Sequence, residues 1–250
     1  MKHIALIIRL VSLTIIILVS LLMVLLLFPI TPRKQWAYVA RKWAKIILLC
    51  VGVRIEVIGN KDDDYIKANT MVISNHISWL DIPVLYTLHF VNFIGRAEIR
   101  KWPLLNLLVK SGGTIFIARD KKRELVKLNQ YISEKLINGA TIGLFPEGKT
   151  GNGDQVLPFK SSLLEAALIA KSSLLPVVIK YYTKTGKQAQ EVTYANDINL
   201  WQTIRNTLQL NGLHVKLILL EQFNAAQFSK REELSAYLFN QIQSTYSKND

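Results

Sequence analysis

The sequence predicts an α/β protein: a mixed, largely parallel sheet flanked by helices, preceded by an N-terminal membrane helix or a two-helix membrane motif. Short runs of apolar and β-branched residues alternate with longer stretches of helical pattern, as in folds that join parallel strands by crossover helices. Ahead of them, residues 10–28 carry no charge. We expect a membrane-embedded helical motif at residues 1–52 and the α/β domain at 53–250.

The first 52 residues have the pattern of membrane-associated helices. The uncharged residues 10–28 would form roughly 28 Å of helix, close to the ~30 Å thickness of the bilayer hydrocarbon. A signal peptide is the alternative, but the apolar stretch is too long for one, and residues 29–32 lack a small-residue cleavage site. Residues 35–51 predict an amphipathic helix with its tryptophans at headgroup level. A hairpin dipped into one leaflet therefore fits as well as a single span.

The positive charge lies in two blocks. Of the net charge of +13, residues 1–60 contribute +7 (eight Lys/Arg against Glu56) and residues 91–123 contribute +6 (eight against Glu98 and Asp120). Two basic blocks predict acidic partners, and anionic lipid headgroups are the first candidate. Nucleic acid is excluded as a partner because no nucleic-acid-binding motif accompanies the charge and the chain begins with a membrane segment.

The charges that flank the apolar helix predict its orientation. Residues 33–45 carry five Lys/Arg, whereas only Lys2 and Arg9 precede residues 10–28. By the positive-inside rule, the main domain would then lie on the cytoplasmic side of the inner membrane.

From Val53 onward the pattern is one of strands and helices. Strand patterns cover residues 53–58, 70–74, 91–95, 114–118, 141–145, 175–181 and 214–220. Helical patterns cover residues 82–89, 102–110, 121–138, 161–171 and 232–247. Residues 182–212 show neither pattern clearly.

The stretch Asn75–Asp81 follows the buried strand at 70–74 and precedes a helix with proline in its first turn. A histidine at a strand end with an aspartate five residues on can form a base and its orienter. The carboxylate would hold one ring nitrogen of His76, and the other would take a proton from a substrate hydroxyl. Alone, such a histidine is more often a structural hydrogen-bonding group.

Further polar residues follow other predicted strands, as expected for a site in an α/β sheet. They are Arg96 with Glu98, Arg119, and the glycine-rich loop at 145–153. The glycines would let the backbone approach a ligand, and successive N–H groups could bind an anion. Each piece also has an ordinary structural explanation, and the loop lacks the spacing of a P-loop.

Other candidate chemical groups carry less weight. Cys50 lies in an apolar run, where a packed or lipid-facing side chain is the ordinary outcome. The acidic trio at 62–64 has no histidine or further carboxylate beside it, so we interpret it as a solvated loop and expect no metal site.

In order and spacing these pieces resemble the glycerolipid acyltransferase family, the lysophospholipid (1-acylglycerol-3-phosphate) acyltransferases. The resemblance rests on four blocks: the His-x4-Asp block at 75–81, Gly113–Arg119, Phe145–Gly148, and the proline-centred stretch 174–178. Together they cover roughly residues 70–180, and the membrane-associated N-terminus also fits.

The resemblance implies transfer of an acyl chain from a thioester to the free hydroxyl of a lysolipid. His76 would be the general base and Asp81 would orient it. The nucleophile is the acceptor's own hydroxyl, so no acyl-enzyme is needed. No cofactor is expected, and the donor is acyl-CoA or acyl-acyl carrier protein. The substrate-binding residues would be Asn75, Arg96, Gly113, Arg119, Glu147, Gly148 and Lys149.

Two departures from the family pattern concern the acceptor. After Glu147-Gly148, many members that make phosphatidic acid have threonine-arginine-serine, whereas this chain has Lys149-Thr150-Gly151. Arg96 replaces a common lysine and keeps the charge, while Lys149 offers a point charge in place of a bidentate arginine. Lysophosphatidic acid is the first choice of acceptor, and another lysophospholipid or a lyso-ornithine lipid the second.

Two other classes of function remain open. A membrane-anchored lipid-binding protein could use the same pocket without catalysis, although a binder has no need of the His76–Asp81 pair. A hydrolase would transfer the acyl group to water.

Overall fold

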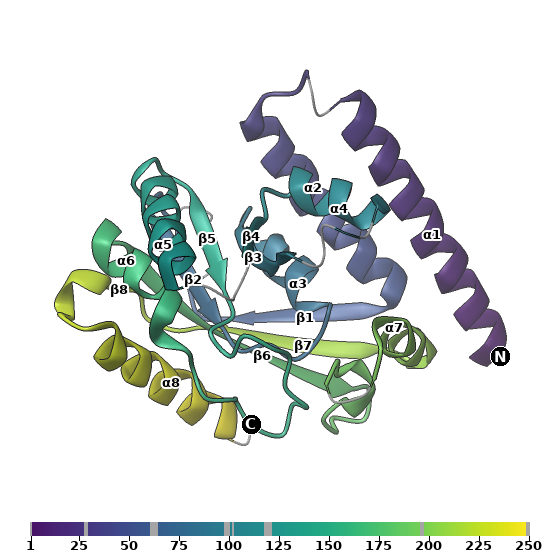
Figure 1. Cartoon of the computed structure of the whole chain (residues 1–250). Helices are drawn as coiled ribbons and strands as arrows, with labels where there is room; N and C mark the ends of the chain where they lie inside the picture. The colour runs from purple at the N-terminus through teal and green to yellow at the C-terminus, as the bar shows by residue number, and fades with distance from the viewer. Residues whose placement is uncertain are drawn as a thin grey trace.

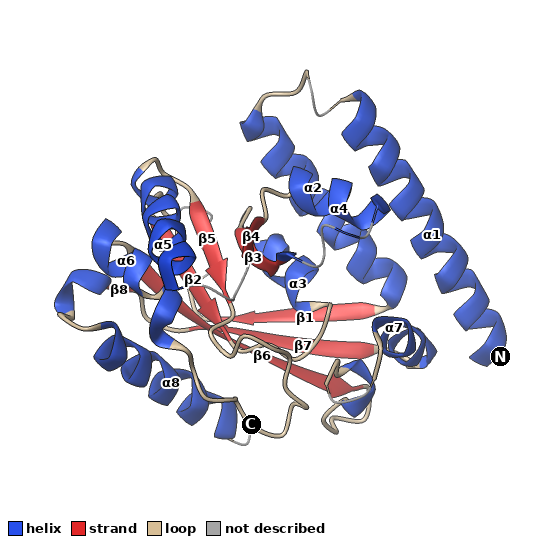
Figure 2. Ribbon diagram, viewed as in Figure 1, coloured by secondary structure: helices blue, strands red, loops and turns tan. Residues whose placement is uncertain are grey.

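The computed structural model describes residues 2–27, 30–60, 65–97, 101, 103–117, 122–195 and 198–248. Within these residues the chain folds into one eight-stranded sheet with helices on both of its faces (Figures 1 and 2). Five of the strand pairs are parallel and two are antiparallel. The predicted α/β class with a mixed, mostly parallel sheet is confirmed.

The strands are β1 (Val53–Ile58), β2 (Thr70–Ser74), β3 (Asn92–Arg96), β4 (Ile115–Ile117), β5 (Thr141–Leu144), β6 (Ser173–Thr183), β7 (Leu213–Leu219) and β8 (Phe223–Asn224). Their order is β1-β7-β6-β2-β5-β3-β4, and β8 pairs with β6. All residues of β2 and β5 are buried, which explains their unbroken apolar sequence: helices cover both faces of the sheet here.

The helices are α1 (Lys2–Leu26), α2 (Arg33–Val51), α3 (Asp81–Leu88), α4 (Pro103–Ser111), α5 (Lys122–Ile137), α6 (Glu165–Ala170), α7 (Leu200–Gln209) and α8 (Arg231–Ser247). These helices pack in two hydrophobic cores, one on each face of the sheet. On one face of the sheet α2, α3 and α7 pack against apolar side chains of β1, β6 and β7. On the other face α5, α6 and α8 pack against β2, β5 and β6.

The predicted strands agree with the observed ones to within about two residues at either end. Two segments differ. The helical pattern at 161–171 forms a 3-10 turn, Ser161–Leu163, before the short α6. The unclear stretch 182–212 contains the ten-residue helix α7, in which Thr203 and Thr207 are buried together with Leu208.

Helix α2 belongs to the core of the α/β fold. Ala44, Ile47 and Leu48 are at most 4 % exposed and lie in the same hydrophobic core as β1 and β7. Trp36 is 7 % exposed, and its Nε1 donates to the carbonyl of Ser111 (3.1 Å). The expectation that the tryptophans of this helix lie at headgroup level is therefore wrong for Trp36. The division at residue 52 stays a prediction.

Helix α1 is apolar around its whole circumference but packs by one stripe only. Its residues 4–26 have a mean hydropathy of 2.7, long and apolar enough by length and composition to cross a membrane. Leu13, Leu21 and Val24 are buried against the fold. The opposite stripe is exposed and consists of Ile4, Ile7, Ile8, Val11, Ile15, Leu18, Val19, Leu22, Leu25 and Leu26.

Arg9 lies on the packed side of α1. Its Nη1 donates to the carbonyls of Leu208 (2.9 Å) and Leu210 (2.6 Å) at the carboxyl end of α7. A cation at this position is favourable because the last carbonyls of a helix carry partial negative charge. This contact fixes α1 relative to α7.

Candidate active site

The site forms where β2 ends. Asn75 is 1 % exposed, and its Nδ2 donates to the carbonyl of Ile179 (2.9 Å) while its Oδ1 accepts from the N–H of Ile179 (2.8 Å). The side-chain amide thus continues the β2–β6 pairing one residue beyond Ser74. The main chain is then free to turn at His76. This geometry favours a positioning role for Asn75 over the substrate contact expected from the sequence.

His76 and Asp81 form a hydrogen-bonded pair, with 2.7 Å between Nδ1 and Oδ2. The Asp81 carboxylate is fully buried at the start of α3. It also accepts from the N–H groups of Ile77 (2.7 Å) and Ser78 (2.9 Å) and from the hydroxyl of Tyr181 (2.6 Å). The two N–H groups and the hydroxyl that donate to it favour the ionised carboxylate, which only accepts. Nδ1 therefore carries the proton, and Nε2 keeps a lone pair.

The imidazole ring of His76 packs against aromatic rings. The ring of His76 stacks on Phe145 with 4.1 Å between centroids and 13° between planes. Phe145 stacks in turn on Phe93 of β3, at 5.7 Å and 3°. The His76 side chain keeps 21 % of its surface exposed. The stack and the carboxylate leave the ring little freedom to rotate.

The loop after β5 holds the backbone of His76 on both sides. The N–H of His76 donates to Oε1 of Glu147 (2.7 Å), and its carbonyl accepts from the N–H of Gly151 (2.7 Å). The second oxygen of Glu147 accepts from the N–H of Leu157 (3.0 Å). Glu147 is 3 % exposed, so both of its oxygens are used within the protein. This geometry favours a role for Glu147 in positioning His76 over the acceptor contact expected from the sequence.

Burial raises the pKa of Glu147 to about 7, because the charged form loses water; the Asp81 charge adds to the rise, and the two backbone N–H groups oppose it. A raised pKa in the folded state means that this carboxyl stabilises the fold most below about pH 4.5, and that this contribution is lost as the pH rises to about 7. We expect Glu147→Gln to remove that slope. Denaturant unfolding of both proteins between pH 4.5 and 8 measures it.

The outcome that contradicts the raised pKa is simple to recognise. If the difference in unfolding free energy between the two proteins is the same at every pH in that range, Glu147 does not change its protonation there. Glu165→Gln provides the control, since Glu165 is exposed on α6 and should leave the slope in place.

Gly113 lies in the turn between α4 and β4, at the amino end of that strand. The site lies at the carboxyl ends of β2 and β5, and β4 runs parallel to them through β3. Gly113 has φ +71°, and a Cβ there would stand 1.9 Å from Nδ2 of Asn92. That amide donates to the carbonyl of Gly113 (3.1 Å). Its position favours a role in this turn over the expected role in acceptor binding.

We therefore expect Gly113→Ala to destabilise the protein by about 1–3 kcal/mol, the usual cost of a strained backbone, plus the displacement of Asn92. The matched control is Gly186→Ala, since Gly186 has φ +80° but no atom within 4 Å of a Cβ. The difference in unfolding free energy between the two variants isolates the steric part. Equal destabilisation would show that Asn92 moves aside at no cost.

The remaining predicted substrate-binding residues are less completely placed. Gly148 has φ +72° in the turn after Glu147, and Lys149 beside it is exposed. Arg96 is the last residue of β3, and its side chain is not among those described. Arg119 lies outside the described residues, two positions beyond the end of β4 at Ile117.

Two residues of the site escaped the sequence analysis. Tyr181 is 2 % exposed, and burial raises the pKa of its hydroxyl well above the ordinary value, with the Asp81 carboxylate as a further cause. The hydroxyl thus stays protonated and donates. Phe145 was part of a recognised block but had no role of its own. In the sequence both residues look like ordinary members of apolar strands.

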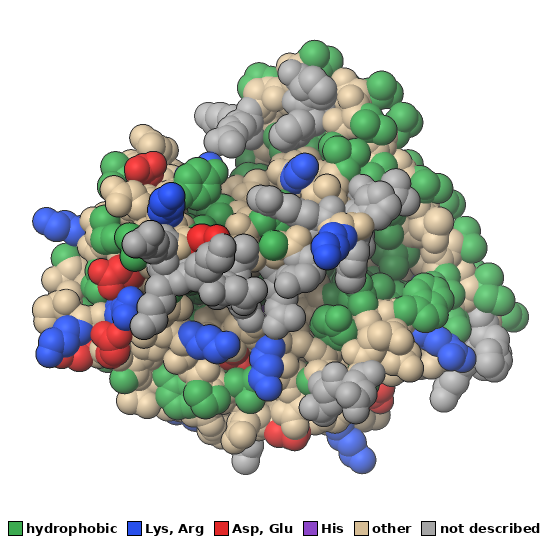
Figure 3. Space-filling view, in the orientation of Figure 1, with side chains coloured by type: hydrophobic (Ala, Val, Ile, Leu, Met, Phe, Trp, Pro, Cys, Tyr) green, Lys and Arg blue, Asp and Glu red, His purple; other side chains and the backbone are tan. Residues whose placement is uncertain are grey.

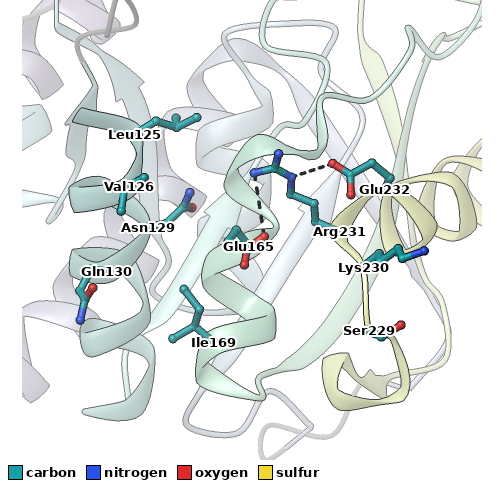
Figure 4. Close-up of a pocket in the computed structure, with 10 residues that line it drawn as sticks. All are labelled: Leu125, Val126, Asn129, Gln130, Glu165, Ile169, Ser229, Lys230, Arg231 and Glu232. Atoms are coloured by element: carbon teal, nitrogen blue, oxygen red, sulfur yellow. Dashed lines mark hydrogen bonds and ion pairs between the residues drawn. The ribbon is translucent and has the colours of Figure 1, made fainter. Parts of the chain in front are cut away.

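One surface pocket lies away from this pair. It has a volume of about 530 Å³ and lies between α5, α6 and the start of α8 (Figure 4). Arg231 at its edge donates to Glu232 (2.8 Å) and lies 3.9 Å from Glu165. The residues that line it are Leu125, Val126, Asn129, Gln130, Glu165, Ile169, Ser229, Lys230, Arg231 and Glu232. No predicted site residue is among them.

Within the described part of the chain, no three His, Cys, Asp or Glu side chains come together as metal ligands would. The acidic trio at 62–64 is outside the described residues.

The comparisons with known proteins bear on this geometry. The sequence model of the family described as Acyltransferase matches residues 54–180. The chain belongs to this family. The match contains His76, Asp81 and Glu147, so the braced pair lies inside the segment that defines the acyltransferases.

Two curated acyltransferases illustrate the range of relatives. The chain is 33 % identical over 164 residues to the 1-acyl-sn-glycerol-3-phosphate acyltransferase of Neisseria gonorrhoeae, which covers 66 % of this chain and 64 % of that protein. It is 30 % identical over 191 residues to the lyso-ornithine lipid O-acyltransferase of Pseudomonas aeruginosa, with 76 % and 71 % covered. The chain thus spans just under two thirds of the length of the Neisseria relative.

A solved structure shares the fold. The 1-acyl-sn-glycerophosphate (LPA) acyltransferase PlsC from Thermotoga maritima matches over the whole of both chains, with a TM-score of 0.75 and 21 % identity. At this identity the likeness concerns the fold alone.

Proposed function

We propose that this acyltransferase moves a fatty acyl chain from a thioester to the free hydroxyl of a lysophospholipid. The observation that carries the proposal is the His76–Asp81 pair, in which a fully buried, four-donor carboxylate fixes the protonated Nδ1 and leaves Nε2 with a lone pair. A ring so constrained is what a general base requires.

In the proposed reaction Nε2 of His76 accepts the proton of the acceptor hydroxyl as the hydroxyl oxygen attacks the thioester carbonyl. The new C–O bond forms, the C–S bond breaks, and the thiolate leaves with the proton that His76 held. Asp81 stabilises the imidazolium in between. No acyl-enzyme arises, because the acceptor itself is the nucleophile. Much of the rate gain would come from holding hydroxyl and thioester together.

Lysophosphatidic acid, 1-acylglycerol-3-phosphate, is the acceptor we favour. The Neisseria relative named for this substrate supports it, and so do the arginines: a guanidinium such as that of Arg119 or Arg96 suits a phosphate. The exposed Lys149 adds a further positive charge beside the loop that braces His76.

A lyso-ornithine lipid is the second candidate. The Pseudomonas relative named for that substrate matches a larger share of this chain than the Neisseria protein does, 76 % against 66 %. Family patterns that accompany phosphatidic acid synthesis also have an arginine where this chain has Thr150.

We further propose that the protein is attached to the cytoplasmic side of the inner membrane through the exposed stripe of α1. Ten large apolar side chains on that stripe are at least 50 % exposed, a surface that soluble proteins rarely keep. Because the other stripe packs on the fold and Arg9 bonds to α7, α1 enters the membrane together with the domain. This arrangement favours attachment to one leaflet over an isolated span.

The test is an acyl-transfer assay of the purified full chain. Acyl-CoA and acyl-acyl carrier protein are each offered with lysophosphatidic acid, lysophosphatidylethanolamine or a lyso-ornithine lipid, and diacyl product is separated and quantified. We expect product with at least one pair, most with lysophosphatidic acid.

The same assay separates the competing functions. If thioester is consumed equally without any acceptor, the protein is a hydrolase. If lysolipid binds but no pair of substrates yields product, the protein is a lipid-binding protein and the proposal fails.

A further inference from the structure

Helix α7 buries its small polar side chains and exposes its largest apolar one. Thr203 and Thr207 are at most 1 % exposed, and their hydroxyls donate to the carbonyls of Thr193 (3.1 Å) and Thr203 (2.8 Å). Trp201, in the first turn of the same helix, is 59 % exposed. Indole carries one of the largest apolar surfaces of any side chain. An arrangement of this kind indicates a partner for the outer face.

The neighbours of Trp201 on that face indicate the chemistry of the partner. Arg205 lies four residues on, so it is on the same side of the helix as Trp201, and it is exposed. Ile198, just before the helix, is 37 % exposed. An indole beside a guanidinium suits the layer between hydrocarbon and water, where the ring lies among lipid headgroups and the cation meets phosphate.

This face continues the exposed stripe of α1. The two helices pack together, and Arg9 of α1 donates to the last carbonyls of α7. In Figure 3 hydrophobic side chains run down the side of the molecule that α1 occupies and reach the region of α7. Since α1 and α7 pack together, a bilayer that receives the stripe of α1 also comes near α7.

We propose that α7 is a second membrane contact beside α1, with Trp201 and Arg205 in the headgroup layer of a bilayer that contains anionic lipid. This inference rests on the proposed membrane attachment of α1. The tryptophan in the headgroup layer would then be Trp201 of α7. Trp36 of α2, for which the sequence predicted that position, is buried against Ser111.

The test measures the depth of single labelled positions in the membrane. The full chain with Cys50→Ser receives one new cysteine, at Trp201→Cys or at Arg205→Cys, and a bimane label. It is reconstituted into vesicles of phosphatidylethanolamine and phosphatidylglycerol, with or without lipid that carries a nitroxide near its headgroup. The two positions check each other should one label disturb the helix.

Matched controls come from α5 and α1. Tyr131 on α5 is 47 % exposed and lies four residues before Lys135, whose Nζ is 5.0 Å from the Tyr131 ring centroid. This pair, changed to Tyr131→Cys or Lys135→Cys, likewise has an aromatic residue four positions before a basic one but lies on the opposite face of the sheet. Leu18→Cys on the exposed stripe of α1 reports membrane attachment itself.

We expect the nitroxide lipid to quench the label at 18, 201 and 205 and to leave 131 and 135 unchanged. Quenching at 18 without quenching at 201 and 205 overturns the α7 contact while the attachment through α1 stands. No quenching at 18 shows that the attachment through α1 has failed, and the α7 contact falls with it. If emission at 201 instead changes with protein concentration in detergent, a second copy of the chain covers α7 and the inference is overturned.

Discussion

Replacing His76 with alanine should lower acyl transfer by about 10²- to 10⁴-fold, the range that a positioned general base contributes. The protein should still fold, because the backbone of residue 76 makes the hydrogen bonds that hold this segment in place. Its N–H donates to Glu147 and its carbonyl accepts from Gly151, and both bonds persist with alanine. The rate with each donor and acceptor pair, beside the thermal midpoint, measures the two effects.

The control for this substitution is His214→Ala. His214 lies on β7, far along the chain from the site, and forms no part of the pair. Its variant should transfer acyl groups at the wild-type rate. Undiminished transfer by His76→Ala would remove His76 from the chemistry altogether.

Asp81→Asn should lower kcat by up to about 10²- to 10⁴-fold, the range that a positioned general base contributes. The asparagine can keep its oxygen towards His76, Ile77 and Ser78 and turn its amide group towards Tyr181, whose hydroxyl can accept as well as donate. The ring would keep its tautomer and orientation, but the imidazolium formed during reaction would lose its counter-charge. Steady-state rates at saturating acceptor measure the loss.

The substitution Tyr181→Phe separates the effect of the Asp81 charge from the effect of the orientation of the His76–Asp81 pair. Alone it removes one of four donors to Asp81, which should cost about 1–3 kcal/mol of stability and reduce kcat by less than about tenfold, because the charge is intact. Combined with Asp81→Asn, it leaves the amide group without an acceptor. The double variant should therefore be less active than Asp81→Asn. Equal activity of the two would mean that Tyr181 does not orient the pair.

The sequence predicted the pairing of His76 with Asp81 because both members come from one short turn. His76 and Asp81 lie five residues apart, and the start of α3 brings the carboxylate back to the ring. The parallel strands were equally easy to predict, since burial on both faces of the sheet leaves unbroken runs of apolar residues. The fold class and the contact between these two side chains were thus accessible from local patterns alone.

The supporting residues were not accessible in the same way. Tyr181 reaches Asp81 from one hundred residues away, and only the register of β6 beside β2 brings them together. Glu147 lies in a glycine-rich loop, where a charged residue suggests contact with a ligand. In the structure the loop folds back, so that the N–H of Leu157 donates to the same carboxylate as the N–H of His76. Such a return depends on tertiary folding, not on composition.

Under the proposed function, the fixed ring of His76 has a consequence for how the acyl thioester is protected from hydrolysis. Stacked on Phe145, bonded to Asp81 and held by its backbone, the ring is ready before any substrate arrives. A base that is always ready accepts a proton from water as readily as from a lipid hydroxyl. In the proposed reaction, the donor would then be spared from hydrolysis by the proposed place of the site at a membrane surface rich in acceptor, and not by an inactive state of the base.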